Sequence, residues 1–354
     1  MNKRLYVDFH VLQTVPPSCV NRDDTGSPKT AYYGGTTRSR VSSQAWKRAM
    51  RLMFRDGLLE REQIGERTKK IVGMVAEQIL ALDPEADAVS MAEKALGNAG
   101  LKIKNAENGT EALFFMSQAQ AQALARLAVE KSEDKKAYKN ALLESPSVDM
   151  VLFGRMVASD PSLNYDAAAQ VAHSISTHAV QNEYDYFTAV DDCAPEDTAG
   201  AGHLGTVEYN SSTMYRYATV NVLELASQLG KEEAAKVVCA FAEAFVCSMP
   251  DGKQNSFANR TLPDAVYVTI REDQPVNLCG AFERAVPASS RGYVEESKKK
   301  LIEYAHQVYH DYTGDPLASF AVGTGLTGVA SPMPLKDLLS ALEAKVTDEL
   351  NKEE

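Results

Sequence analysis

The stretch CVNRDDTGSPKTAYYGGTTRSRVSSQAWKRAMRLMFR, residues 19–55, carries the chain from a predicted strand through a long basic loop into a helix. The 354-residue chain is acidic, with a formal net charge of -11. Residues 1–55 nevertheless hold ten Lys and Arg against three Asp and Glu, a local balance of +7. Because an acidic chain gathers its cations in one short run, we expect one surface that binds a polyanion.

The elements around this run follow from periodicity. Residues 4–12, RLYVDFHVL, alternate as a strand does. A long loop over 13–41 follows, and loops of this length are usually functional or disordered. Ser42 or Ser43 then offers the N-cap of a helix over about 43–56.

The predicted helix has one basic face. Lys47, Arg51 and Arg55 share that face, with Arg48 beside them, and Trp46 belongs to the opposite apolar stripe. An ordinary amphipathic surface helix has the same pattern. A basic loop at the helix N-terminus, whose backbone N–H groups are free, favours a phosphate-binding role.

The rest of the chain predicts an α+β fold. Further strand patterns lie at 148–157, 213–222 and 265–271, and a helical pattern lies at 231–248. Residues 58–145 have the Ala, Gln, Lys and Glu content of exposed helices. If this insertion and residues 178–212 are set aside, the order is βαββαβ, a ferredoxin-like or RRM-type sheet. Three helical patterns follow, near 280–286, 290–312 and 333–350.

Residues 178–212 predict a protruding β-hairpin, because two alternating segments surround a Gly/Ala-rich patch. Tyr184, Tyr186 and Phe187 exceed what such a hairpin needs for its own stability. Exposed aromatic rings offer stacking surfaces for nucleobases. The same rings would also suit packing against a protein neighbour, and both roles are compatible in an oligomer.

Seven blocks of the sequence carry a family resemblance. They are SCVNRDD (18–24), YGGTTRSRVSSQAWKRAMR (33–51), FGRM (153–156), HSISTH (173–178), DYFTAVDD (185–192), HLGT (203–206) and YRYA (215–218). These blocks strongly resemble CasC, the backbone subunit of the type I-E CRISPR Cascade complex, in the Cas-seven superfamily. They occur in the same order and cover most of residues 4–290.

The resemblance implies an RRM-like palm, a helical fingers insertion and a hairpin thumb. The corresponding segments are palm 1–57, fingers 58–145, palm 146–177, thumb 178–212, palm 213–290 and C-terminal helices 291–354. It also implies that copies stack head-to-tail along a CRISPR RNA, that each thumb kinks the guide, and that the bases between kinks pair with target DNA. The implied partners are CRISPR RNA, copies of the chain itself, other Cascade subunits and target DNA through the guide.

The resemblance also assigns residues. The expected RNA contacts, including an apolar wedge and the thumb residues at the kink, are Arg22, Arg38, Arg40, Ser43, Gln44, Lys47, Arg48, Arg51, Arg155, Leu163, Tyr186 and Phe187. Target DNA is expected near Lys29, Lys131, Lys135, Lys136 and Lys139, although the KSEDKK cluster is also typical of a solvated face. A subunit that binds any spacer should hold phosphate and sugar and leave sequence reading to base pairing.

We expect no catalysis, no metal and no cofactor. The enzymatic alternative is metal-dependent cleavage of target RNA by Asp23 and Asp24, as in type III relatives. That pair has no obvious third carboxylate, and Asp-Asp before Thr-Gly-Ser is also a turn signature. The stretch GTGLTG, 323–328, lacks the Lys-Ser/Thr ending of a P-loop. A third class is a structural oligomer that binds no nucleic acid.

The expected location is the cytoplasm. No apolar stretch approaches the ~20 residues that cross a bilayer, and the start MNKRLYVDFHVL lacks a signal-peptide pattern. Five scattered cysteines without a C-x-x-C argue against a disulfide framework or a zinc ribbon.

Overall fold

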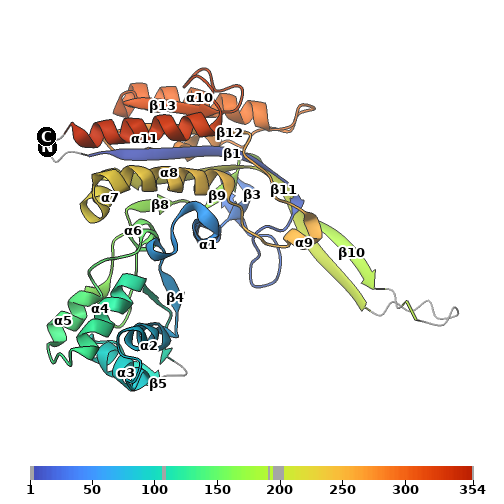
Figure 1. Ribbon diagram of the computed structural model, residues 1–354. Coiled ribbons are helices and arrows are strands. Elements are labelled where there is room, and N and C mark those ends of the chain that lie inside the picture. Colours follow the sequence, from blue (N-terminus) through green and yellow to red (C-terminus); the bar gives the residue numbers. More distant parts are fainter. Residues whose placement is uncertain (1–3, 106–108, 190–191, 194–202, 353–354) are drawn as a thin grey trace. The chain divides into compact units, whose positions relative to one another are not determined.

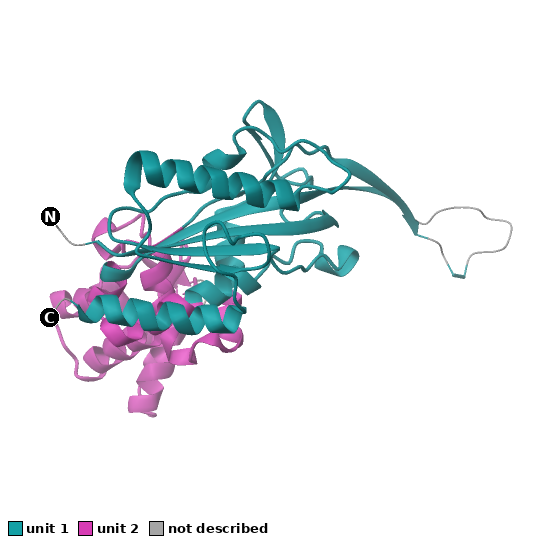
Figure 2. Cartoon of the chain, turned by 90° about the horizontal axis from the view of Figure 1, so that it is seen from above, with its two compact units in different colours: residues 1–50, 171–223, 241–354 teal, residues 51–170, 224–240 magenta. Residues whose placement is uncertain are grey.

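The computed structural model describes residues 4–105, 109–189, 192–193 and 203–352 (Figure 1). The chain divides into two compact units (Figure 2). Unit 1 comprises residues 1–50, 171–223 and 241–354, and unit 2 comprises residues 51–170 and 224–240. Four elements contain a boundary between the units: α1 (Ser43–Met53), β8 (Ala169–Val171), α7 (Val222–Leu229) and α8 (Lys231–Cys247).

Unit 1 contains a large antiparallel sheet in the order β13-β12-β1-β11-β9-β3-β2. The strands in this order are β1 (Tyr6–Ser18), β2 (Thr30–Tyr33), β3 (Thr36–Val41), β9 (Ser174–Ser176), β11 (His203–Asn221), β12 (Ala265–Arg271) and β13 (Ala318–Val322). Two further strands, β8 and β10 (Glu183–Ala189), also pair with β11. β1 lies between β11 and β12, with Phe9 opposite both Ala218 and Val268. β11 and β12 are thus parallel to each other, and α7 and α8 connect them as in a split βαβ unit.

Both faces of β1 are buried, which explains its long run of apolar residues. On one face, Phe9 lies 5.4 Å from Phe241 and 6.1 Å from Phe245 of α8, measured between ring centroids. On the other face, Leu12 belongs to a cluster that includes residues of α10 (Val294–Val308). Figure 1 places α8 and α10 on opposite sides of β1.

Three predicted strands are confirmed as β1, β11 and β12, but the predicted strand over 148–157 is wrong. Residues Val148–Phe153 form the short helix α6, which ends at Gly154 with φ 77°. A short, continuous apolar run does not distinguish a strand from a buried helix. The sheet position on the far side of β11 is filled by β9 instead.

The segment predicted as one long loop contains regular structure. β1 continues to Ser18, and β2 and β3 form a tight hairpin in which Tyr33 lies opposite Thr36. The two residues between them, Gly34 and Gly35, have φ values of 58° and 79°. Two successive positive φ angles define the turn that suits a two-residue hairpin, and glycine adopts them without strain.

Unit 2 is helical, as the composition of residues 58–145 predicts. The α-helices that lie wholly within it are α2 (Ile71–Leu82), α3 (Ala88–Asn98), α4 (Gln118–Val129), α5 (Lys135–Ala141) and α6. Two small strand pairs join them: β4 (Glu66–Thr68) with β7 (Phe114–Met116), and β5 (Ile103–Asn105) with β6 (Gly109–Thr110). Val75, Ile79, Leu96 and Leu124 belong to its apolar core.

A hairpin projects from the sheet of unit 1 (Figure 1). Its strands are β10 (Glu183–Ala189) and the first part of β11, with Glu183 opposite Tyr209 and Ala189 opposite His203. Every residue of β10 is exposed. The Gly/Ala-rich patch predicted within this hairpin lies outside the described residues.

The C-terminal helical patterns are confirmed in part. The first is a short 3-10 turn, Leu278–Phe282, the second is α10 followed by the helical turn Tyr309–Thr313, and the third is α11 (Leu335–Asn351). A four-residue helix, α9 (Gln254–Phe257), precedes β12. Within the described part of the chain, no helix has both the length and the apolar character needed to cross a membrane.

Candidate nucleic-acid interface

The basic loop between β1 and β2 is shaped by an aspartate. Asp23 Oδ1 accepts hydrogen bonds from Thr25 N at 2.9 Å, Thr25 Oγ1 at 2.7 Å and Ser27 N at 3.0 Å. The Thr25 hydroxyl is the main reason that the pKa of Asp23 lies below its usual value. Asp24 is exposed beside it. Among the described residues, no three His, Cys, Asp or Glu side chains are grouped so that they could hold a metal ion.

The same loop is tied to the start of α1. Asn21 Oδ1 accepts a hydrogen bond from Ser42 N at 2.9 Å, and Lys29 N donates to Asn21 O at 2.8 Å. Arg22 lies between these two anchors and is exposed, with its backbone bridged to Pro28. Two predicted RNA-contact segments, the loop and the helix N-terminus, are therefore adjacent in unit 1.

Lys29 and Arg40 form a second basic group. Arg40 Nε donates to Thr30 O at 3.1 Å, and its Nη1 lies 3.2 Å from His173 Nδ1. Partial burial lowers the pKa of His173, and the charges of Arg40 and Lys29 lower it further. His173 is exposed, and its lowered pKa favours a neutral ring that can form hydrogen bonds beside the two cations. The sequence block HSISTH contains it, but no spacing in the sequence links it to Arg40.

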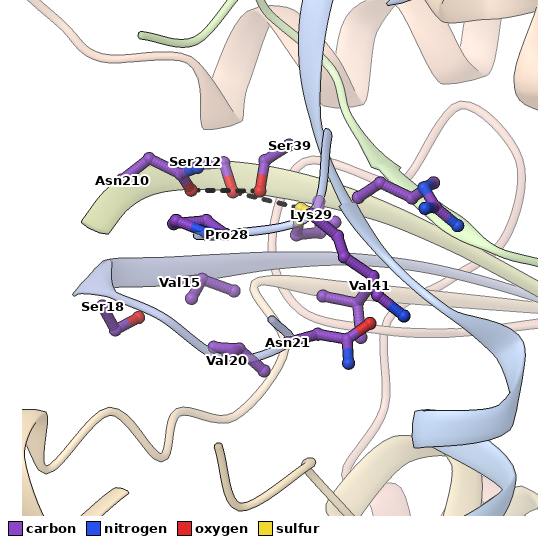
Figure 3. Close-up of a pocket in the computed structure, with 12 residues that line it drawn as sticks. Val15, Ser18, Val20, Asn21, Pro28, Lys29, Ser39, Val41, Asn210 and Ser212 are labelled. Carbon is purple, nitrogen blue, oxygen red and sulfur yellow. Dashed lines mark hydrogen bonds between the residues drawn. The ribbon is translucent and has the colours of Figure 1, made fainter. Parts of the chain in front are cut away.

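A small pocket opens beside this group (Figure 3). Lys29 and Arg40 line it together with polar side chains of β3 and β11. One wall is fixed by Ser39 Oγ, which donates to Asn210 Oδ1 at 3.1 Å. The pocket has room for a water-sized group only, so it is too small to hold a nucleotide.

Helix α1 presents its polar side chains unevenly. Gln44 and Arg48 are exposed, and Ser43 and Lys47 are half-buried. Burial lowers the pKa of the Lys47 ammonium group. Arg48 Nη1 lies 3.6 Å from Asp251 Oδ2, but its side chain keeps 66% of its surface exposed. A charge pair this exposed contributes little stability, so the guanidinium remains accessible to a phosphate.

One basic residue of this region was not predicted. Lys253 lies immediately before α9 and has a left-handed backbone, φ 52°. Burial raises the pKa of the Cys19 thiol, and the nearby charges of Arg22 and Lys253 oppose that rise. Both cations are thus close to Cys19. The sequence around Lys253 looks like an ordinary surface loop, so only the fold reveals this neighbourhood.

Arg38 has a structural role in place of the predicted RNA contact. Its side chain is completely buried. Nη1 donates to Ser176 O at 2.9 Å, and Nη2 donates to Phe282 O at 2.9 Å and to Glu283 O at 3.1 Å. A guanidinium whose donors are consumed by backbone carbonyls joins β3, β9 and the 3-10 turn and offers no surface to a ligand.

Arg51 also differs from the prediction. In unit 2, Arg51 Nε donates to Asp149 Oδ2 at 2.8 Å and Nη2 donates to Gly65 O at 3.2 Å. The guanidinium carbon lies 4.5 Å from the centre of the Phe115 ring. The Arg51 side chain is 22% exposed, and Asp149 is fully buried. Arg51 therefore neutralises a buried carboxylate.

Arg155 and Leu163 were predicted to contact RNA, but both side chains are buried inside unit 2. Arg155 Nε donates to Leu163 O at 2.9 Å, and its Nη2 donates to Leu142 O at 2.8 Å. Burial lowers the pKa of Arg155 to about 10. Leu163 is fully buried in the apolar core. Neither side chain is available to a polymer in this conformation.

The lysine cluster of unit 2 is mostly solvated. Lys131, Lys135 and Lys136 are exposed around the start of α5. Lys139 Nζ instead pairs with Asp160 Oδ2 at 2.8 Å and lowers the pKa of that carboxyl to about 2. Three of the four predicted lysines thus remain open to a ligand such as DNA.

The two predicted aromatic contacts on the hairpin lie on opposite faces. Tyr186 and Phe187 are neighbours in β10, and successive residues of a strand point to opposite sides. Tyr186 is 65% exposed and Phe187 is 40% exposed. The two rings therefore cannot press on one nucleotide from the same side.

The fold is that of an α+β protein with a large antiparallel sheet, and one surface of unit 1 collects cations. Residues 7–343 match the model of the family described as CT1975-like protein. The chain belongs to the CT1975-like protein family. The comparison with curated proteins gave no match.

Two solved structures are similar over nearly the whole chain. One is a chain of a "CRISPR RNA-guided surveillance complex, pre-nicking", which is 32% identical in sequence and has a TM-score of 0.79. The match covers 96% of this chain and 100% of that chain. The other, from a "CRISPR RNA-guided surveillance complex", is 30% identical over 95% of this chain and 99% of its own length, with a TM-score of 0.63.

Proposed function

We propose that this chain is a CRISPR RNA-binding backbone subunit of a type I-E Cascade complex and that it has no catalytic activity. Copies bind head-to-tail along the guide, kink it at regular intervals and present it for pairing with target DNA. Other Cascade subunits complete the assembly. The observation that carries this proposal is the 32% identity, end to end, with a chain of a CRISPR RNA-guided surveillance complex.

The surface chemistry of unit 1 supports the proposal. Arg22, Arg48 and the pair Lys29 and Arg40 offer cationic groups that a phosphate backbone attracts. A guide-binding subunit needs contacts that tolerate every spacer sequence, and cations that bind phosphate provide such contacts. Lys253, whose charge acts on Cys19 as that of Arg22 does, is a further cation near this loop.

The projecting hairpin supports a head-to-tail arrangement. It extends from the sheet and is exposed along all of β10. An arm of this kind reaches a neighbouring copy, and a head-to-tail contact that does not close on itself produces an open filament. An open filament matches the extended shape of a single RNA strand.

Salt titration of RNA binding tests the proposal. We expect the full chain to bind three unrelated single-stranded RNAs with equal affinity, measured by fluorescence anisotropy. An Arg22→Ala/Arg48→Ala/Lys253→Ala variant should lower the slope of log K against log salt by about 0.7 for each phosphate that it no longer neutralises. Arg284→Ala, which removes an exposed charge elsewhere in unit 1, should leave the slope unchanged. Binding that ignores salt or depends strongly on RNA sequence would contradict the proposal.

A further inference from the structure

The hairpin has two chemically different faces, because the pairing register puts opposed residues on the same side. The acidic face consists of Glu183, Asp185, Phe187, Gly205, Val207 and Tyr209. The tyrosine face consists of Tyr184, Tyr186, Thr188, Leu204, Thr206 and Glu208.

The acidic face is unsuited to RNA. A Cβ added to Gly205 would lie 2.3 Å from the Phe187 ring, so this ring rests on the Gly205 backbone. Near the root, the Tyr209 ring lies 6.0 Å from the ring of Phe257 in α9. Glu183 and Asp185 are exposed on the same side and repel phosphate groups.

The tyrosine face has the opposite character. Tyr184 is 67% exposed and Tyr186 is 65% exposed. The one carboxylate on this face, Glu208, accepts a hydrogen bond from Asn182 Nδ2 at 3.0 Å and is half-buried at the root. Two large rings on one face of the hairpin are thus presented to solvent.

The spacing of the two rings matches a nucleobase. Residues two apart on a strand are separated by ~6.8 Å, and their side chains stand roughly perpendicular to the sheet. Stacked bases are ~3.4 Å apart. The space between two such rings therefore equals two stacking distances, which is the thickness that one inserted base requires.

We propose that Tyr184 and Tyr186 form a clamp that holds one unpaired nucleobase of a single-stranded RNA between their rings. The inference rests on the proposed function for the identity of the polymer, and it adds Tyr184 as a binding residue. Stacking accepts any base, because every base has a π-face. Phe187 belongs to the other face and supports the hairpin backbone.

A fluorescent base tests the clamp. Full-length protein is mixed with single-stranded RNAs that carry 2-aminopurine at one position each, and both fluorescence and affinity are measured. Stacking between two rings should quench 2-aminopurine at clamped positions. Tyr184→Ala and Tyr186→Ala should each remove the quenching and weaken binding about tenfold. Phe at both positions should preserve quenching and affinity, because only the ring is needed.

Variants of the acidic face serve as matched controls. Phe187→Ala should keep the quenching, and Glu183→Gln/Asp185→Asn should change the affinity by less than about twofold. Quenching that survives Tyr184→Ala, or that is lost in Phe187→Ala, overturns the clamp. Much tighter RNA binding after neutralising the two acids also overturns it, because the RNA would then lie on the acidic face. If the wild-type chain binds no RNA at all, the proposed function fails and the clamp fails with it.

Discussion

The guanidinium carbon of Arg216 lies 3.7 Å from the centre of the Trp46 ring, inside unit 1. Trp46 Nε1 donates to Ser174 Oγ at 2.8 Å, and Arg216 Nη1 donates to Gln13 Oε1 at 2.6 Å. The buried side of α1 is thereby fixed to β1, β9 and β11. Because this side is fixed, Gln44 and Arg48 on the same helix face solvent.

We predict that Trp46→Ala lowers the free energy of unfolding of unit 1 by about 3–5 kcal/mol. The variant removes a completely buried ring and leaves the Arg216 charge without its aromatic partner. Urea unfolding followed by circular dichroism measures the loss. Arg48→Ala, an exposed residue of the same helix, should change stability by less than about 0.5 kcal/mol. An equal loss in both variants would contradict the anchoring role.

Arg51→Ala should destabilise unit 2 by about 3 kcal/mol, because it leaves the buried Asp149 carboxylate without a counter-charge. Adding Asp149→Asn should restore more than half of that stability, since the amide oxygen can still accept from Gly65 N. RNA binding should recover in the double variant, although the positive charge is not restored. If the double variant is well folded and still binds RNA weakly, Arg51 itself contacts the RNA.

Asp8 and His10 on β1 should give opposite pH dependences. Burial raises the pKa of Asp8 to about 6 and lowers the pKa of His10 to about 3. The native state binds the extra Asp8 proton between pH 3.8 and about 6, so this group costs stability as pH rises through that window. The native state lacks the His10 proton between about 3 and 6.5, so that group costs stability as pH falls.

The two contributions nearly cancel in the wild-type chain between about pH 4 and pH 6. Asp8→Asn should therefore lose stability on acidification by about 1.4 kcal/mol per pH unit, and His10→Gln should lose it on raising the pH. The single tryptophan, Trp46, reports unfolding of unit 1 by fluorescence. If the free energy of unfolding depends on pH in the same way in both variants, Asp8 and His10 do not have opposing effects on stability.

The catalytic alternative has its own test. Full-length protein incubated with complementary RNA and Mg²⁺ should leave the RNA intact, since Asp23 Oδ1 holds the turn at Thr25 and Ser27. Asp23→Ala should loosen the loop and weaken RNA binding, whereas Asp24→Ala should have little effect on binding. Periodic cuts that disappear in either variant would instead support a ribonuclease.

Much of the sheet could be predicted from the sequence, because strands such as 265–271 are marked by their composition and length. The β2–β3 hairpin was missed although Gly34 and Gly35 mark its turn, since the Arg and Lys content of the segment favoured a functional loop. Helix α6 was misassigned because six mostly apolar residues fit either state. The resemblance of the quoted blocks identified the class of complex, which the end-to-end structural similarity supports.

The candidate site was harder to predict, because a sequence shows charge but not burial. Arg38 and Arg155 look like surface cations, yet their partners are backbone carbonyls that lie up to 245 positions away in the chain. Only the fold reveals such partners. The same holds for Lys253, which is far from Cys19 in the sequence although its charge acts on the Cys19 thiol. Tyr186 and Phe187 were predicted together as contacts at the kink, although the alternation of a strand places neighbouring residues on opposite faces.

In the proposed assembly, several copies of this chain share one CRISPR RNA. Native mass spectrometry of the purified full-length protein, with sequencing of any RNA that co-purifies, counts the protein copies on each RNA. We predict a mass of several protein copies on one RNA, with RNA sequences that combine a constant repeat with variable spacers. Protein found only as single copies without RNA, or bound to RNA of random origin, would contradict the proposed assembly.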